Sequence, residues 1–379
     1  VQDKRGESQP FLKQIWAIMR RRSKTEMHIW GLCWLLLLAA SAVSAFAATP
    51  SPPASIRNIV VTGGNKGQGL ALCDRILAEN EDTRVLMCSR NLQRGQDAAD
   101  KLRRDLEERG IATSLDDDVD RIEVIQLDVT SEESVASAAA CVQDILQASS
   151  GDGSGSLYGV VSNAGILWGY PLSELMGVCA TGVRRVCDAF LPMLQDDGRL
   201  IVVSSGLGPL MHGYSSKERQ SAMMNPSCTW EGTLMPIIEE LLDAYESSTD
   251  EDRPKAFESI GFPGGPFADS APDFHHYGLS KMVADAYMKV LAQFHPNLRI
   301  NSCDPGLVYT DLILRMPRYE GMSREETNGA QTPHEGVEAA MRLLFDDNAG
   351  KDSESGKFYA MSKDKKELLH SDIDKMPNK

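Results

Sequence analysis

The chain has 379 residues, a net charge of −15 and a 42% share of hydrophobic residues. This length fits one large globular α/β domain or two small ones. The acidic balance argues against nucleic acid or an anionic membrane as a partner, because phosphate contacts need clustered Lys and Arg. Its eight cysteines show no Cys-x-x-Cys pair and no His at ligand spacing, so neither a metal site nor a disulfide framework is expected.

Residues 1–54 have the pattern of a targeting leader. Basic residues at 20–24 precede an uncharged stretch over 29–48, and Val43 and Ala45 suit signal cleavage after Ala45. Met19 or Met27 would then be the initiator. The junction at 44–47 and the Pro/Ser/Ala-rich segment behind it resemble the bipartite presequences of algae with complex plastids, which predicts plastid import. An uncleaved membrane or endomembrane anchor and secretion are the alternatives.

The rest of the chain alternates between strand and helix patterns. Apolar runs predict strands at 59–62, 85–89, 124–127, 159–162, 200–204 and 300–304, with a weaker edge strand at 357–360. Helical patterns begin at Leu70 and cover 92–108, 131–147, 182–194 and 277–294. Such alternation predicts an α/β fold with a parallel, doubly wound sheet. The domain is expected to span 55–362 and to be followed by a polar tail at 363–379.

A glycine-rich turn follows the first predicted strand. The string Thr62-Gly63-Gly64-Asn65-Lys66-Gly67-Gln68-Gly69 leads directly into the helical pattern. Glycines let the backbone approach a pyrophosphate, and the helix N-terminus offers free N–H groups and a positive dipole end. The sequence therefore predicts a dinucleotide site at this turn.

Tyr277 and Lys281 lie four residues apart, on one face of a predicted helix. The pKa of a free tyrosine is about 10, and a cation within a few ångström lowers it by roughly 1–3. Lys281 can thus prepare Tyr277 to protonate the alkoxide that forms when a nicotinamide delivers hydride to a carbonyl carbon. The pair predicts hydride chemistry on a carbonyl or alcohol.

The glycine turn, Asn163-Ala164-Gly165 and the Tyr277–Lys281 string occur in the order found in the short-chain dehydrogenase/reductase family. The chain resembles that family over about 55–358, and within it the carbonyl reductases. The resemblance implies a Rossmann-type doubly wound parallel sheet in a single domain, with a nicotinamide cofactor and a small-molecule carbonyl substrate.

Arg90 follows the second strand at the position where NAD-selective folds carry an acid. An arginine there can hold a 2′-phosphate, and Lys66 can add a second cation, so NADP(H) is the expected cofactor. Asp128 either contacts the adenine or caps the helix after Thr130. The resemblance assigns cofactor contacts to Gly63, Asn65, Lys66, Gly67, Gly69, Arg90, Asp128, Val129, Asn163, Tyr277, Lys281, Pro305, Gly306, Val308 and Thr310.

The resemblance gives Ser205 the role of the serine that hydrogen-bonds the substrate carbonyl, while Ser204 points to the opposite side if the strand still alternates there. The family's asparagine in the helix before the fifth strand is missing, because alignment places Cys179 at that position. The segment 166–175 is also short and lacks most of one helix. A different proton relay, a lost exon and impaired activity remain open alternatives.

More than 70 residues separate Ser205 from Tyr277, so an insertion is expected at 206–275. Similar insertions in monomeric carbonyl reductases cover the surface that other members use for oligomer packing, and 235–245 is amphipathic, which predicts a monomer. Several aromatic residues of the insertion either line an apolar substrate mouth or form the insertion's own core, namely Trp230, Phe262, Phe267, Phe274 and His275.

We therefore expect an NADPH-dependent reductase of a ketone, aldehyde or quinone, with Ser205, Tyr277 and Lys281 as catalytic residues and Tyr277 as general acid. One alternative is a family alcohol dehydrogenase that works oxidatively, which the cations for a 2′-phosphate disfavour. The other is a catalytically impaired protein that senses or scaffolds through NADP(H).

Overall fold

The computed structural model describes residues 56–115, 119–149, 155–264, 271–350 and 355–373. The predicted leader and Phe267 lie outside these residues. Within the described part of the chain, no helix is both long and apolar enough to cross a membrane.

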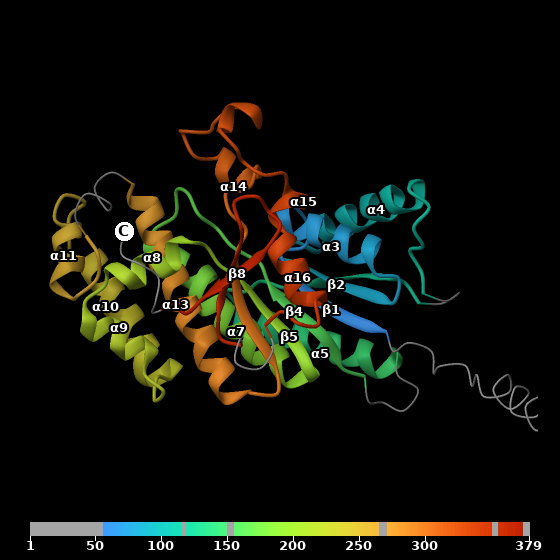
Figure 1. Cartoon of the computed structure of the whole chain (residues 1–379), viewed down its shortest axis with the longest axis horizontal. Helices are drawn as coiled ribbons and strands as arrows, with labels where there is room; N and C mark the ends of the chain where they lie inside the picture. The colour runs from blue at the N-terminus through green and yellow to red at the C-terminus, as the bar shows by residue number, and fades with distance from the viewer. Residues whose placement is uncertain (1–55, 116–118, 150–154, 265–270, 351–354, 374–379) are drawn as a thin grey trace, which may run out of the picture. The chain divides into compact units, whose positions relative to one another are not determined.

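Eight strands of the described residues form one sheet in the order β3-β2-β1-β4-β5-β6-β7-β8 (Figure 1). Neighbouring strands pair in parallel except for the antiparallel pair of β7 and β8. The order reverses between β1 and β4, which opens a crevice at their carboxyl ends. The strands are β1 (Arg57–Thr62), β2 (Thr83–Ser89), β3 (Ile122–Gln126), β4 (Leu157–Ser162), β5 (Leu194–Val203), β6 (Arg299–Asp304), β7 (Phe358–Met361) and β8 (Leu368–Ser371).

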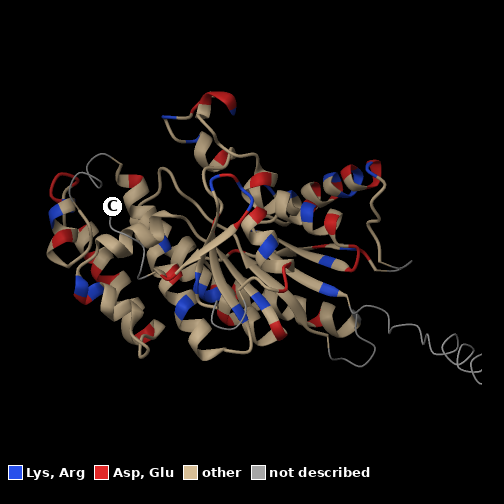
Figure 2. Cartoon of the chain, in the orientation of Figure 1, with Lys and Arg blue, Asp and Glu red and all other residues tan. Residues whose placement is uncertain are grey.

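Both faces of the sheet are covered by helices, as the continuous apolar runs of the strands predict. Val60 and Leu86 point to a core beneath α5 (Glu132–Ser149), α7 (Gly182–Phe190) and α13 (Pro272–Phe294). Ile59 and Val85 point to the opposite core beneath α3 (Gly67–Glu79), α4 (Leu92–Glu108) and α16 (Glu338–Phe345). The prediction of a doubly wound parallel α/β sheet is confirmed. Figure 2 shows acidic and basic residues along α4, on the outside of the second layer.

The segment predicted as a polar tail contributes a strand. β8 pairs antiparallel with β7, with Tyr359 opposite His370. Leu369 in this strand is 50% exposed, so the edge strand lacks the buried apolar run by which the other strands are predicted.

The helix before the fifth strand begins earlier than predicted. α6 (Leu172–Met176), a π-helical turn η1 (Gly177–Thr181) and α7 follow one another without a break. The short connection at 166–171 therefore precedes a helix that runs from Leu172 to Phe190. A 3-10 turn, η2 (Leu191–Met193), then leads directly into β5.

The long insertion forms helices that pack on α7 and α13. Trp230 lies 5.1 Å from the ring of Tyr287 of α13, and Phe262 is buried in the same core. These two aromatic residues therefore belong to the insertion's core and not to a substrate mouth. The insertion comprises α8 (Leu207–Tyr214), α9 (Lys217–Met224), η3 (Trp230–Leu234), α10 (Met235–Glu246) and α11 (Arg253–Ser259). Three short elements follow β6, namely α14 (Asp311–Leu314), η4 (Glu325–Thr327) and α15 (Pro333–Gly336).

Candidate active site

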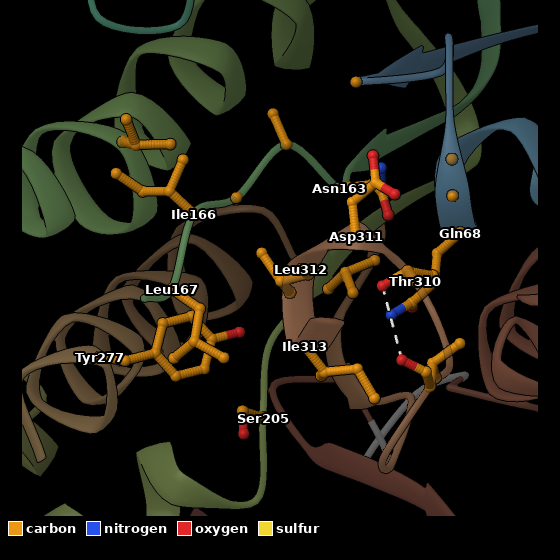
Figure 3. Close-up of a pocket in the computed structure, with 18 of the residues that line it drawn as sticks. Gln68, Asn163, Ile166, Leu167, Ser205, Tyr277, Thr310, Asp311, Leu312 and Ile313 are labelled. Atoms are coloured by element: carbon orange, nitrogen blue, oxygen red, sulfur yellow. Dashed lines mark hydrogen bonds between the residues drawn. The ribbon is translucent and has the colours of Figure 1, made fainter. Parts of the chain in front are cut away.

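One cavity of about 1470 Å³ lies at the carboxyl ends of the central strands. Its lining contains every residue that the sequence predicted for cofactor binding or catalysis. Figure 3 shows Ser205 and Tyr277 on one side of this cavity, with Gln68, Asn163 and Thr310 across from them. The fold thus brings together residues that are more than 200 positions apart in the chain.

The glycine turn has the backbone that a pyrophosphate cradle needs. Gly63 and Gly67 adopt φ angles of 65° and 54°, which residues other than glycine rarely adopt. A Cβ on Gly69 would lie 2.2 Å from the Gly63 carbonyl oxygen, so the turn closes only around glycine. Among the described residues no side chain caps α3, whose first amides face the cavity free to bind an anion. These features fit a dinucleotide.

Three cations line the other end of the cavity. Arg90 is exposed at the end of β2, and Arg94 follows it in the first turn of α4, where its backbone N–H donates to the Asn91 side chain (2.9 Å). Lys66 in the glycine turn forms an exposed ion pair with Asp311 (3.1 Å). Lys66 would have to leave that partner, at small cost for an exposed pair, to reach a phosphate.

Asp128 and Asn163 hold the strand ends in place. Asp128 accepts hydrogen bonds from the backbone N–H and hydroxyl of Thr130 (2.9 and 2.7 Å), so it caps the turn before α5 and also lines the cavity. Burial raises the pKa of Asp128, but these bonds and the charge of Arg90 outweigh it and leave that pKa lowered. Asn163 donates through its side chain to the Thr62 carbonyl (2.8 Å), which ties β4 to β1.

The segment after β6 closes the cavity beside the glycine turn. Gly306 has φ of 73° and donates its N–H to the Asp304 carboxylate (2.9 Å), while Gln331 donates to the Pro305 carbonyl (2.8 Å). Thr310 lies 3.4 Å from where a Cβ on Gly67 would stand. Val308 is buried. The loop and the turn therefore form the two walls of one crevice.

The residues predicted to be catalytic lie on α13 and at the end of β5. Tyr277 is 9% exposed, and the Lys281 ammonium lies 5.4 Å from the centroid of its ring. Lys281 is buried and donates to the Val203 carbonyl (2.8 Å), which fixes its position against β5. Ser205 follows two residues later, and its hydroxyl accepts from the Leu207 N–H (3.3 Å). A phenol, an ammonium and a hydroxyl thus share one end of the cavity.

The short chain dehydrogenase family model matches residues 57–217. The chain is 26% identical to (+)-neomenthol dehydrogenase of Arabidopsis thaliana over 314 residues, which are 76% of this chain and 91% of that protein. It is 28% identical over 291 residues to carbonyl reductase [NADPH] 3 of Rattus norvegicus, at 73% and 89% coverage. The solved structure of salutaridine reductase from Papaver somniferum aligns with a TM-score of 0.59 and 23% identity, covering 80% of this chain and 99% of that one.

The chain is similar to the short-chain dehydrogenase/reductase family over residues 57–217, the segment that holds the glycine turn, Arg90 and Ser205. The glycine turn and the loop after β6 line one crevice, which is where the sequence predicts the nicotinamide cofactor.

The structure corrects one electrostatic expectation about Tyr277. The sequence predicts that Lys281 lowers the pKa of Tyr277, but the structure holds that pKa well above its usual value. Burial of the phenol is the main cause, and the charges of Cys179, Asp304 and Asp285 add to it. In the protein alone, Tyr277 is therefore a firmly protonated phenol.

Ser204 and Ser205 point to different surroundings, as the alternation predicts. Ser205 is half-buried and faces the cavity in Figure 3. Ser204 also borders the cavity, but it is 1% exposed and its hydroxyl interacts with the buried carboxyl of Asp285. The placement favours Ser205 as the residue that meets a substrate.

Cys179 lies in the π-helical turn η1, buried behind the cavity lining. Its thiol is buried and lies 3.5 Å from the Ile166 carbonyl oxygen, to which it can donate. It packs in one apolar cluster with Tyr277 and Leu167. π-helical turns are often found at functional sites. The thiol thus contacts the backbone of the segment after β4, and its correspondence to the family's asparagine stays a prediction from the sequence.

The end of the cavity beside Tyr277 is apolar. Phe274 lines it as predicted, whereas His275 is buried away from it with its ring nitrogen Nε2 2.6 Å from the Pro263 carbonyl oxygen. Two arginines, Arg315 and Arg318, stand in the lining from the segment after α14. The other lining side chains at this end are Ile166, Leu167, Trp168, Tyr170, Leu207, Leu210, Tyr309, Leu312 and Ile313.

Sequence reasoning missed several polar residues of the cavity, among them Arg94, Asp304 and Gln68. Arg94 lies in the first turn of the helix that follows Arg90, which could have signalled a second cation at this strand end. Asp304 directly precedes Pro305-Gly306, and Gln68 lies inside the glycine turn, so both could have been proposed from position alone. Among the residues that the structure describes, no three His, Cys, Asp or Glu side chains cluster as metal ligands would.

Proposed function

We propose that the protein is an NADPH-dependent reductase that converts a bulky, mainly apolar ketone or related carbonyl compound to an alcohol, with Tyr277 as general acid. The observation that carries the proposal is the single cavity that joins the glycine turn to the Tyr277, Lys281 and Ser205 group. Similarity to the family supports the reaction class, and the distribution of charged and apolar side chains along the cavity supports the choice of cofactor and substrate.

NADP(H) is proposed over NAD(H) because of the three cations Lys66, Arg90 and Arg94 at the end of the cavity remote from Tyr277. A 2′-phosphate is bound well by guanidinium groups, which match its oxygens with paired donors. The relative named carbonyl reductase [NADPH] 3 is consistent with this choice.

The substrate is proposed to be apolar and bulky because aromatic and aliphatic side chains predominate beside Tyr277. Relatives named for neomenthol and salutaridine are consistent with a ring-containing ketone of this kind. A small polar carbonyl compound would leave much of this apolar surface in contact with water, and so would bind weakly.

In the proposed reaction the reduced nicotinamide supplies the hydride. Ser205 donates a hydrogen bond to the substrate carbonyl oxygen and so orients it. Tyr277 then gives its phenolic proton to that oxygen as negative charge develops on it. Lys281, fixed by the Val203 carbonyl, stabilises the phenolate that remains.

The test is NADPH oxidation by the purified protein on a panel of cyclic ketones, aldehydes and quinones. Tyr277→Phe should lower kcat by roughly 10²- to 10⁴-fold while leaving the Kd for NADPH within about threefold, because a general acid contributes to the chemical step. Tyr287→Phe removes a hydroxyl from the same helix but outside the cavity, and should leave kcat unchanged. Equal turnover by Tyr277→Phe and the unaltered protein would refute the assigned role.

Two alternatives have specific outcomes in the same assay. Cys179 in place of the family's asparagine favours an impaired protein that senses or scaffolds through NADP(H), and tight NADPH binding without turnover on any compound would support it. An oxidative alcohol dehydrogenase would turn over the corresponding alcohols with NADP⁺ at neutral pH faster than it reduces the ketones.

We further propose a monomer, because the insertion packs on α7 and α13 through Trp230 and its neighbours. A mass by light scattering that matches one chain would support this, and twice that mass would refute it.

Import into a plastid is proposed from the leader pattern alone. The test is a fluorescent protein fused behind residues 1–60, compared with a fusion that lacks residues 29–48. Fluorescence in the plastid from the first fusion alone would support import, and a signal at the cell surface or in the endomembranes would contradict it.

A further inference from the structure

Helix α13 carries a third ionisable group in line with the two catalytic ones. Tyr277, Lys281 and Asp285 follow one another at intervals of four residues and share one face of the helix. Asp285 is completely buried, and neither carboxylate oxygen has a well-formed hydrogen bond with any described residue. A buried acid without such bonds is costly, so its position calls for an explanation.

The start of α8 covers this carboxyl. A Cβ on Gly208 would lie 2.3 Å from Asp285 Oδ2 and 3.1 Å from the Lys281 backbone carbon, so only glycine fits between the helices. Gly208 is three residues beyond Ser205 and donates its N–H to the Ser205 carbonyl (2.9 Å). Asp285 is therefore packed between Lys281 and the turn that carries Ser205.

A second buried acid completes the arrangement. Asp304 lies at the end of β6 and accepts a hydrogen bond from the Gly306 N–H (2.9 Å). A Cβ on Gly206 would lie 3.1 Å from its other oxygen, so Asp304 also touches the turn after Ser205. Lys281 is thus the cation beside Asp285, and Asp304 is a second acid close enough to act on Asp285.

Burial raises the pKa of Asp285 to about 7, the charge of Asp304 adds to the rise, and Lys281 and the hydroxyls of Ser204 and Ser302 oppose it. Asp285 is therefore neutral in acid and carries a negative charge at alkaline pH. That charge acts on Tyr277, whose pKa is raised by burial and then by Cys179, Asp304 and Asp285.

We propose that Asp285 is a positioning residue that acts through Lys281 to keep Tyr277 in its phenol form, and so biases the site towards carbonyl reduction and against alcohol oxidation. The inference rests on the proposed function. Reduction needs a phenol that can give a proton, whereas oxidation needs a phenolate that can take one. A negative charge near the phenol disfavours the phenolate, and it also offsets the stabilising effect of Lys281.

The titratable side chains around this group act on Tyr277 with opposite signs. Lys281 favours the phenolate, and Asp304, Asp285 and the thiols oppose it when ionised. The groups are Lys281 and Asp285 on α13, Cys303 and Asp304 at the end of β6, Cys179 on η1 and the buried His212 on α8.

The size of the effect follows from the helix geometry. Eight residues of α-helix correspond to a rise of about 12 Å. Two unit charges at that distance, with an effective dielectric constant of about 20, shift the titration of Tyr277 by about one pH unit. At pH 8, removal of the Asp285 charge should therefore raise the phenolate fraction, and with it the rate of alcohol oxidation, about tenfold.

The experiment measures the pH profile of alcohol oxidation with NADP⁺ for the full chain and for Asp285→Asn, which keeps the side chain's shape. The acidic limb of kcat/KM should move to lower pH by about one unit, while the KM for NADP⁺ stays the same. Ser280→Ala, a buried polar change on the same helix, should leave the limb in place. A uniform loss of rate in Asp285→Asn with an unmoved limb would overturn the proposal, since a merely structural role gives that result.

A second readout needs no turnover and separates this proposal from the proposed function. The ultraviolet absorbance of tyrosinate, taken as the difference between each protein and its Tyr277→Phe counterpart, titrates Tyr277 directly. Its alkaline onset should come about one pH unit earlier in Asp285→Asn, and an unchanged onset overturns the inference even if no carbonyl substrate is found. If the Asn variant does not fold, Asp285→Ala serves with the same expected direction.

Discussion

Replacement of Arg90 by Gln tests the cofactor choice most directly. Arg90 lies at the end of β2, in the lining of the cavity and close enough to Asp128 to lower the pKa of that carboxyl. Gln keeps the length and polarity of the side chain but removes the charge. If Arg90 holds the 2′-phosphate, the loss must fall on NADPH and not on NADH, which has a hydroxyl there.

The expected magnitude follows from the exposure of the side chain. A hydrogen bond to a charged group contributes about 1.5–3 kcal/mol, and about 1.4 kcal/mol corresponds to a tenfold change in Kd. Because Arg90 is exposed and solvent screens its charge, the lower half of that range applies. The Kd for NADPH should rise about 10- to 40-fold in Arg90→Gln, and the Kd for NADH should change less than about twofold.

The assay is quenching of protein fluorescence by each nucleotide, at low and at high salt. Arg104→Gln is the matched control, since Arg104 is an exposed residue of α4 outside the cavity lining. That control removes the same net charge and should leave both affinities unchanged. Equal losses for NADPH and NADH in Arg90→Gln would refute the phosphate role, and so would equal losses in the two variants.

Two further predictions concern the glycine turn and the insertion. Gly69→Ala should weaken NADPH binding tenfold or more, because its Cβ would lie 2.2 Å from the Gly63 carbonyl oxygen. Gly177→Ala is the control: a Cβ there has no neighbouring atom within 4 Å, so this variant should bind NADPH normally. Burial lowers the pKa of His275 to about 4 and of His276 to about 3, so the unfolded chain alone takes up these protons as pH falls below about 6.5. The melting temperature should therefore drop between pH 6.5 and 4, and His276→Phe should reduce the drop; an unchanged slope would contradict this account.

The fold could be predicted from the sequence because its strands are buried on both faces. Val60 and Ile59 are neighbours in β1 and both are fully buried, so the strand appears as a continuous apolar run. β8 could not be predicted in this way. It pairs on one side only, and Leu369 is half exposed, so no such run marks it. The start of the helix at Leu172 was missed for another reason. The segment before it is shorter than in the carbonyl reductases that the chain resembles, so the sequence comparison suggested a missing helix where the structure has a short connection at 166–171.

The candidate site could be predicted where a residue's role depends on its place after a strand. Arg90, Asn163, Ser205 and Pro305 each follow a strand, and the parallel sheet brings all strand ends to one edge. The protonation state of Tyr277 could not be predicted from its helix alone, because the pKa of the phenol depends on burial and on acidic groups from other elements. Asp285 appears in the sequence as one more polar residue of a long helix, and only the close packing of Gly208 shows what surrounds its carboxyl.

The two ends of the cavity should respond differently to salt, because their charges differ in exposure. Lys66 is 60% exposed on its side chain and Arg90 is exposed, so mobile ions screen both, and NADPH affinity should weaken as ionic strength rises. Asp285 and Lys281 are buried, where mobile ions do not reach them and their interaction with Tyr277 persists. Salt therefore separates the two proposals in one protein: it should raise the Kd for NADPH while the acidic limb of alcohol oxidation stays at the same pH.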